Sequence, residues 1–219
     1  MATTDVKTVR QVVTQAMRKS GILAFGEDAE SDDADAVRDE LEIMLKGWQN
    51  AGYNLWTKTA MSLTLTTAAA YTLDPVRPLR ILSARLKRNG TEIPMEQMTR
   101  DEYDSLPVKT TTGQPTQFYY DRQREAARFY VWPVLSSASG ETVEITYDRE
   151  LEDIASLSDA IDVPGEWLDA VVYNLAARIG ETVPSERTPA IMARARQLLS
   201  DAMGFDREGS VYFAGPWAE

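Results

Sequence analysis

Apolar residues recur every three or four positions near both ends of the chain, which is the spacing of an amphipathic helix. The first such stretch covers residues 4–20, and Gly21 is placed to end it. The second follows the acidic linker 26–36, and one of its faces is apolar: Val37, Leu41, Met44, Leu45 and Trp48. Because glycine tolerates the left-handed conformation that closes many helices, Gly52 is predicted to end this second helix.

Two more helices are predicted in the last third of the chain. Asp162 is a suitable N-cap and Pro164 suits a first turn. The apolar stripe that follows is Leu168, Val172, Leu175 and Ile179. Thr188 and Pro189 begin a fourth helix in the same way, and Gly204 is placed to end it. Its predicted inward face is Ile191, Ala195, Leu198, Leu199 and Ala202.

The middle of the chain has a different period. Between residues 58 and 150 apolar and polar residues tend to alternate and β-branched residues become frequent, which is typical of strands. The Asn89-Gly90 pair favours a type I′ turn between two of them. We therefore predict an antiparallel sheet of about five or six strands, which ends with the strand at residues 141–147.

Two of these predicted strands are rich in aromatic residues: Phe118, Tyr119, Tyr120, Phe129, Tyr130 and Trp132. Exposed aromatic side chains can stack on nucleic-acid bases, and aromatic residues on neighbouring strands can also pack against one another. Few basic residues accompany them: Arg122, Arg124 and Arg128. Since a nucleic-acid surface usually carries more positive charge, cross-strand packing is the favoured interpretation.

This order of elements predicts an α+β protein. Residues 1–57 and 162–204 are expected to form one helical core, and residues 58–161 an antiparallel β insertion with its connector. Residues 205–219 contain too much glycine and proline for regular structure and are predicted to form an extended tail. Aromatic side chains in an exposed segment usually mark a contact surface. We therefore expect four of them to anchor the tail on a partner: Phe205, Tyr212, Phe213 and Trp217.

The composition removes several classes of enzyme. The chain has 219 residues and contains no cysteine and no histidine. It therefore offers no thiolate or imidazole to a metal, and it cannot use the serine–histidine or cysteine–histidine pairs of many hydrolases. No glycine motif for nucleotide phosphates occurs, so no cofactor is expected. No apolar run is long enough for a membrane helix, and the N-terminal residues lack the apolar core of a secretory signal.

The possibilities that remain are catalysis by carboxylates, catalysis by lysine, or no catalysis. A glycosidase uses a pair of carboxylates, and candidate pairs occur among Glu150, Glu152 and Asp153, although chance pairs are plentiful among 34 acids. Another acidic group, Asp32, Asp33 and Asp35, lacks the spacing of an EF-hand loop. It is expected to stabilise the positive end of the second helix instead.

The net charge of −11 disfavours tight binding to DNA phosphates. The same charge suits a surface past which DNA moves without sticking, because like charges repel. Simple solubility is the alternative explanation.

The order of several motifs resembles that of the head-to-tail adaptor proteins of tailed bacteriophages, in particular the tail accessory, or packaged-DNA stabilisation, proteins of short-tailed phages. The most recognisable motif is LxxMLKxWQxxGxNLWT at residues 41–57. The others follow in the family's order and are PLRILSARL (78–86), PMEQMTRDEYDSLPVKTTTGQPTQFYYD (94–121), FYVWPV (129–134), ITYDRELEDI (145–154) and DVPGEWLDAVVYNLAARI (162–179). The resemblance covers most of residues 5–205, while the acidic linker and the aromatic tail lie outside it.

The resemblance implies a structural virion protein without enzymatic activity. It implies a ring of about twelve identical subunits at the head–tail junction, docked under the portal protein. Such a ring would extend the DNA channel, retain packaged DNA without sequence-specific binding, and present a platform for the next tail component (a nozzle, needle or fibre). The protein would be made in the cytoplasm of the host bacterium, and no membrane would be involved.

A ring of identical subunits needs a head-to-tail interface. We expect the acidic stretch that contains Asp32, Asp33 and Asp35 to face, on the next subunit, the basic residues Arg187, Arg194 and Arg196. The alternative is that these arginines lie on a solvent-exposed helix face and contact no neighbouring subunit. Competing functions are another tail-tube or baseplate component, a cell-wall hydrolase that uses acids, and a DNA-binding regulator.

Overall fold

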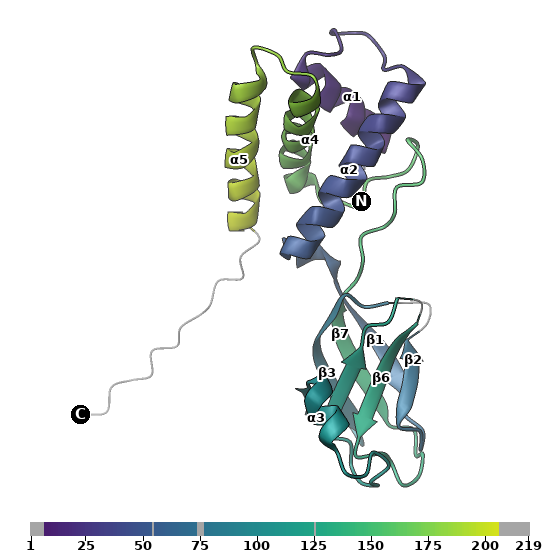
Figure 1. Cartoon of the computed structure of the whole chain (residues 1–219). Helices are drawn as coiled ribbons and strands as arrows, with labels where there is room; N and C mark the ends of the chain where they lie inside the picture. Colours follow the sequence, from purple (N-terminus) through teal and green to yellow (C-terminus); the bar gives the residue numbers. More distant parts are fainter. Residues whose placement is uncertain (1–6, 54, 74–76, 125, 206–219) are drawn as a thin grey trace, which may run out of the picture. The chain divides into compact units, whose positions relative to one another are not determined.

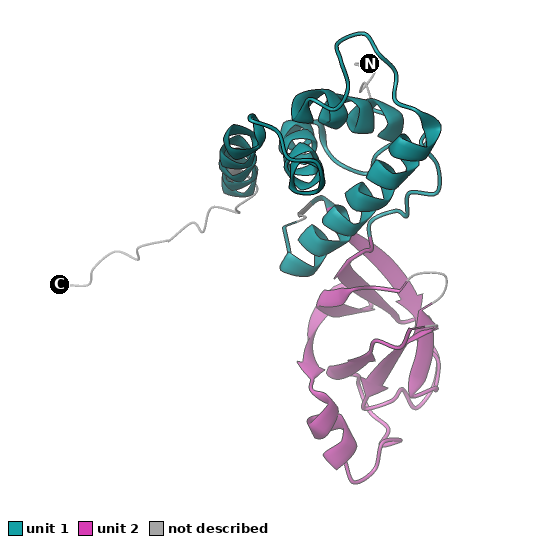
Figure 2. Cartoon of the chain, turned by 45° about the horizontal axis from the view of Figure 1, so that its top comes forward, with its two compact units in different colours: residues 1–56, 151–219 teal, residues 57–150 magenta. Residues whose placement is uncertain are grey.

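The structure is a computed structural model that describes residues 7–53, 55–73, 77–124 and 126–205. The chain divides into two compact units, which Figure 2 distinguishes by colour. Residues 1–56 and 151–219 belong to the helical unit, and residues 57–150 form the β unit. The protein therefore has the predicted α+β class.

Four α-helices build the helical unit (Figure 1): α1 (Val9–Ser20), α2 (Ser31–Ala51), α4 (Leu168–Thr182) and α5 (Thr188–Phe205). Thr8 caps α1, because its hydroxyl accepts from Gln11 N while the Gln11 side chain accepts from Thr8 N. Gly21 ends α1 and Gly52 ends α2, both in the left-handed conformation, as predicted. Asp162 does not cap α4, since the short 3₁₀ turn Gly165–Trp167 leads into that helix.

The segment that follows residue 150 packs with the helices. Its buried residues, spaced by three or four, join the core of the helical unit: Leu151, Ile154, Leu157 and Ile161. Backbone hydrogen bonds fix it against the start of α1, where Val9 N donates to Asp159 O at 2.9 Å and Ile161 N donates to Lys7 O at 3.0 Å. The structure therefore differs from the predicted boundary, which grouped residues 151–161 with the β insertion.

Helix α4 is the central element of the helical unit and contacts α1, α2 and α5. Figure 1 shows it between α5 and α2. Asn174 Nδ2 donates to Ala170 O within α4 and to Ala195 O of α5, at 2.8 and 3.1 Å. At Gly180 a Cβ atom would lie only 3.0 Å from Thr188 Cγ2, so the absence of a side chain permits this close approach of the two helices.

The β unit is a curled seven-stranded sheet with the strand order β1-β7-β3-β4-β5-β6-β2. The strands are β1 (Lys58–Thr64), β2 (Ala70–Leu73), β3 (Arg80–Arg88), β4 (Thr91–Met98), β5 (Gln117–Asp121), β6 (Ala127–Trp132) and β7 (Thr142–Asp148). The prediction of a purely antiparallel sheet is wrong at one place, because β4 and β5 are parallel. The short helix α3 (Arg100–Ser105) and the loop after it turn the chain back, so that β5 starts beside Glu96 near the C-terminal end of β4 and runs in the same direction.

Alternating side chains of the strands fill the interior of the β unit. Phe118, Leu86, Phe129 and Ile145 are among its most deeply buried residues. Tyr120 is partly buried at the same core, and its hydroxyl donates to Pro78 O at 2.5 Å. This contact ties β5 to the segment that leads into β3.

Tyr120 gives the β unit a measurable response to alkali. Burial raises the pKa of Tyr120 to about 12, from an ordinary value of 10.0. Below pH 10, the ordinary pKa of tyrosine that applies to the unfolded chain, the neutral phenol of Tyr120 makes its full contribution to the stability of the fold. This contribution is lost as the pH rises from about 10 through about 12, the pKa in the folded protein. We expect the free energy of unfolding of the β unit to fall over this range, and to fall less in Tyr120→Phe. An equal fall in both proteins would contradict this assignment.

Candidate interaction surfaces

The acidic residues at the start of α2 do not form a metal site. Asp32 and Asp33 are exposed in the first helical turn, where they oppose the positive end of the helix dipole. Asp35 is half-buried and accepts from Arg38 Nη1 at 2.9 Å. Within the described ranges, no group of three or more acidic side chains is arranged so that it could hold a metal ion.

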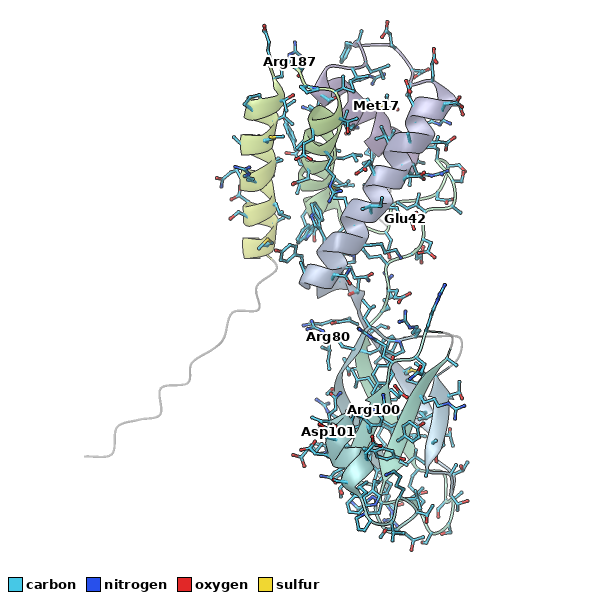
Figure 3. The ribbon with its side chains drawn as sticks, in the orientation of Figure 1. Met17, Glu42, Arg80, Arg100, Asp101 and Arg187 are labelled. Atoms are coloured by element: carbon cyan, nitrogen blue, oxygen red, sulfur yellow. The ribbon has the colours of Figure 1, made fainter. Side chains whose placement is uncertain are left out.

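One face of α2 has no partner among the described residues of the helical unit. We call it the α2 stripe, and all of its members are exposed: Asp32, Ala36, Asp39, Ile43, Gly47 and Asn50. Helical spacing places them along one line of the helix surface. The lower part of the stripe borders a shallow hollow of about 520 Å³, together with Glu42 and Lys46. Figure 3 labels Glu42 on this helix. The Ile43 side chain is 59 % exposed in this hollow.

The structure separates the three arginines that the sequence grouped. All are exposed, and none forms an ion pair within the described part of the chain. Arg187 and Arg194 lie seven residues apart, so they share one flank of α5, whereas Arg196 lies on the opposite flank. Arg196 borders a hollow of about 220 Å³ between α2, α4 and α5, whose apolar lining includes Trp48 and Met192. Arg187 directly precedes Thr188, the first residue of α5, and Figure 3 shows it at that end of the helix.

A second exposed feature lies at the end of the helical unit where two loops meet. Ser185 Oγ donates to Ser20 O at 3.3 Å, which links the loop before α5 to the end of α1. These loops border a hollow of about 640 Å³ that is lined in part by Arg18, Phe25 and Arg187. Phe25 is 100 % exposed and lies 5.9 Å from the Arg18 guanidinium. Sequence reasoning missed this residue, although an isolated phenylalanine beside an acidic linker was a visible signal.

The four tail residues are at the edge of the described structure or beyond it. Phe205 is the last residue of α5. Tyr212, Phe213 and Trp217 lie outside the described residues. Their expected role as anchors therefore stays a prediction.

Most of the acidic residues that were considered as a catalytic pair of a hydrolase form ion pairs with basic side chains. Glu150 accepts from Arg77 Nη1 at 2.7 Å within the β unit. Asp153 accepts from Lys46 Nζ at 2.6 Å within the helical unit. Glu152 is exposed. Two of the three carboxylates are thus held in ion pairs, which favours a structural role over a catalytic one.

The aromatic residues of the sheet pack against one another, which confirms the cross-strand interpretation. Phe118 and Phe129 stack in the interior with ring centroids 5.1 Å apart. On the other face, the ring of Tyr119 lies 5.7 Å from that of Tyr130 and 5.1 Å from that of Tyr103 in α3. These rings cover each other and do not present a row of open faces to nucleic-acid bases.

In the part of the chain that the structure describes, none of the helices is long and apolar enough to cross a membrane. The exposed features that remain are a face of α2, three arginines that form no ion pair among the described residues, and Phe25; features of this kind are typical of protein contacts.

Comparison with known proteins agrees with this description. No curated protein matches the chain. The family model described as SU10 adaptor protein matches residues 8–217, which include both units and nearly the whole chain. The resemblance found in the motifs is thereby confirmed, and the chain belongs to the SU10 adaptor protein family of phage head-to-tail adaptors, which are structural proteins of the virion.

Proposed function

We propose that this protein assembles into a ring of about twelve subunits between the phage portal protein and the next tail component, such as a nozzle, needle or fibre. The ring sits at the head–tail junction, continues the DNA channel, and retains the packaged genome. The main observation that supports this proposal is the match of the family model to residues 8–217. The protein catalyses no reaction in this role, in keeping with a sequence that has neither histidine nor cysteine.

The charge of the chain supports a conduit for DNA. A net charge of −11 disfavours adhesion of the phosphate backbone to the ring wall, so DNA can pass without sequence-specific binding. Retention of the genome then results from the narrowness of the assembled channel and from the tail component that closes it.

Two sets of residues are proposed to make the contacts between proteins. The acidic start of α2, with Asp32, Asp33 and Asp35, faces basic residues of the neighbouring subunit, and the candidates for these are Arg187, Arg194 and Arg196. The exposure of these arginines, and their lack of ion pairs among the described residues, support this proposal. The tail is the second contact, and its anchors on a neighbour or on the portal protein are Phe205, Tyr212, Phe213 and Trp217.

Imaging of the protein with the portal protein of the same phage tests the proposed function. We expect class averages to show a ring of about twelve copies bound to one end of the portal, and native mass spectrometry to give the same stoichiometry. A monomer in isolation is compatible with assembly on the portal. If the purified protein neither forms a ring nor binds the portal, the proposal is wrong.

A further inference from the structure

We propose that the α2 stripe is the surface on which α5 of the next copy docks, an inference that rests on the ring proposed above. The partner is a second copy of this chain, and it contributes the flank of α5 that carries Arg187 and Arg194. This narrows the interface to one face of each helix. It leaves Arg196 outside the contact, because that residue lies on the opposite flank of α5.

The lower half of the α2 stripe has the features of a site for close contact. Ile43 is 59 % exposed and is the one large apolar residue of the stripe. Gly47 lies one turn further on, and its backbone has no left-handed conformation that would require glycine. A Cβ atom at Gly47 would meet no atom of another described residue within 4 Å, so none of the described residues needs the space either. A neighbouring helix that rests on Ile43 and approaches the backbone at Gly47 would use both features.

The charges of the two faces are complementary. The stripe carries Asp32 and Asp39, and the Asp39 carboxylate remains 65 % exposed although it accepts from Arg38. The α5 flank carries Arg187 and Arg194, neither of which has an ion pair among the described residues. The two aspartates and the two arginines are each seven residues apart, which corresponds to about 10.5 Å along a helix. Two adjacent helices can therefore place both arginines opposite both aspartates at once.

The direction of the helices decides which charges meet. α2 and α5 both begin at the end of the helical unit where the loops around Gly21 and Ser185 come together. Rotation about the axis of a many-membered ring changes the direction of each successive subunit only slightly. The two helices therefore run in the same general direction across the interface, inclined to one another as α2 and α5 are in Figure 1, which pairs Asp32 with Arg187 and Asp39 with Arg194.

The location of the two faces fits a ring. Figure 1 shows α4 between α5 and α2, and α5 packs chiefly on α4. The stripe and the flank are thus different surfaces of one subunit, and a contact between them is heterologous. A heterologous contact repeats from copy to copy, whereas a self-complementary contact stops at a dimer.

The natural absence of cysteine makes the contact testable by cross-linking. Ala36 in the stripe and Ala190 beside the arginines are both small and exposed, so cysteine at these positions leaves the charges intact. A disulfide forms only when the Cα atoms approach within roughly 4.4–6.8 Å. We expect the Ala36→Cys/Ala190→Cys protein to give a ladder of dimers, trimers and larger species upon oxidation, both alone at high concentration and on the portal protein. The control Ala36→Cys/Arg196→Cys is expected to stay monomeric on a denaturing gel.

Charge reversal in the double-cysteine protein tests the pairing itself. Arg194→Asp and Asp39→Arg are each expected to reduce the ladder at least about tenfold, because each places like charges opposite one another. The two changes together are expected to restore it, and Arg196→Asp is expected to leave it unchanged.

The outcomes separate this inference from the proposed function. Absence of a ladder in both conditions, or an equal ladder from the Arg196 control, overturns the inference. If rings on the portal are nevertheless imaged, only the assignment of the interface is wrong. If no ring forms on the portal, the proposed function fails with it.

Discussion

Replacing Trp167 with alanine is expected to destabilise the helical unit by about 3–5 kcal/mol, the usual cost of removing a large aromatic side chain from a core. The Trp167 side chain is 0 % exposed. Its ring lies 5.8 Å from that of Trp48 in α2 and 5.0 Å from that of Trp56. It therefore joins the start of α4 to the end of the most recognisable motif of the sequence. No smaller residue can fill this space, so the loss combines lost burial with a cavity.

Chemical denaturation followed by circular dichroism and by tryptophan fluorescence measures this effect. Trp48, Trp56 and Trp167 belong to the helical unit, whereas Trp132 reports on the β unit. We expect the helical transition to shift to lower denaturant concentration in Trp167→Ala, while the β transition changes less. Phe25→Ala is the matched control, because its aromatic ring is fully exposed and should contribute little to stability. Equal destabilisation by the two variants would show that Trp167 is not a core residue.

Deleting residues 206–219 is expected to abolish assembly on the portal protein while the fold stays intact. The deletion begins after Phe205, the last residue of α5, and leaves all the described helices and strands in the chain. It does remove the proposed anchors Tyr212, Phe213 and Trp217. Aromatic anchors in an interface often contribute ~2 kcal/mol or more each, so loss of three should weaken binding by several powers of ten.

Binding to the portal and the melting temperature should be measured together for this truncation. A full-length protein with Tyr212, Phe213 and Trp217 replaced by alanine separates the contribution of the aromatic rings from that of chain length. We expect both variants to keep the melting temperature of the unaltered protein and to lose binding. Normal ring assembly by the truncated protein would show that the tail is not an anchor.

Much of the helical unit could be predicted because the sequence of each helix contains local features that favour helix formation. The spacing from Leu41 to Trp48 and the stop at Gly52 depend only on local periodicity and on a backbone conformation that glycine favours. Cross-strand packing of Phe118 and Phe129 followed from the lack of basic residues around them. The family could also be inferred, because the order of several motifs is a property of the sequence itself.

The candidate contact surfaces were harder to predict. The three arginines were grouped because they are near one another in the sequence, whereas helical spacing along α5 places Arg196 on the side opposite the other two. Exposure of Ile43 and Phe25 could not be foreseen either. An apolar residue in a helix or short loop is usually buried, and whether it is buried depends on which elements pack against it.

The sequence by itself determined the helices and most strands, the exclusion of histidine and cysteine chemistry, and the family, since these follow from local pattern, composition and motif order. Only the tertiary structure decided that residues 151–161 complete the helical core, that β4 and β5 run parallel, and that the described residues leave one face of α2 uncovered. These features depend on contacts between segments far apart in the chain. Local periodicity cannot specify such contacts, because the same spacing of apolar residues is compatible with packing against many different partner segments.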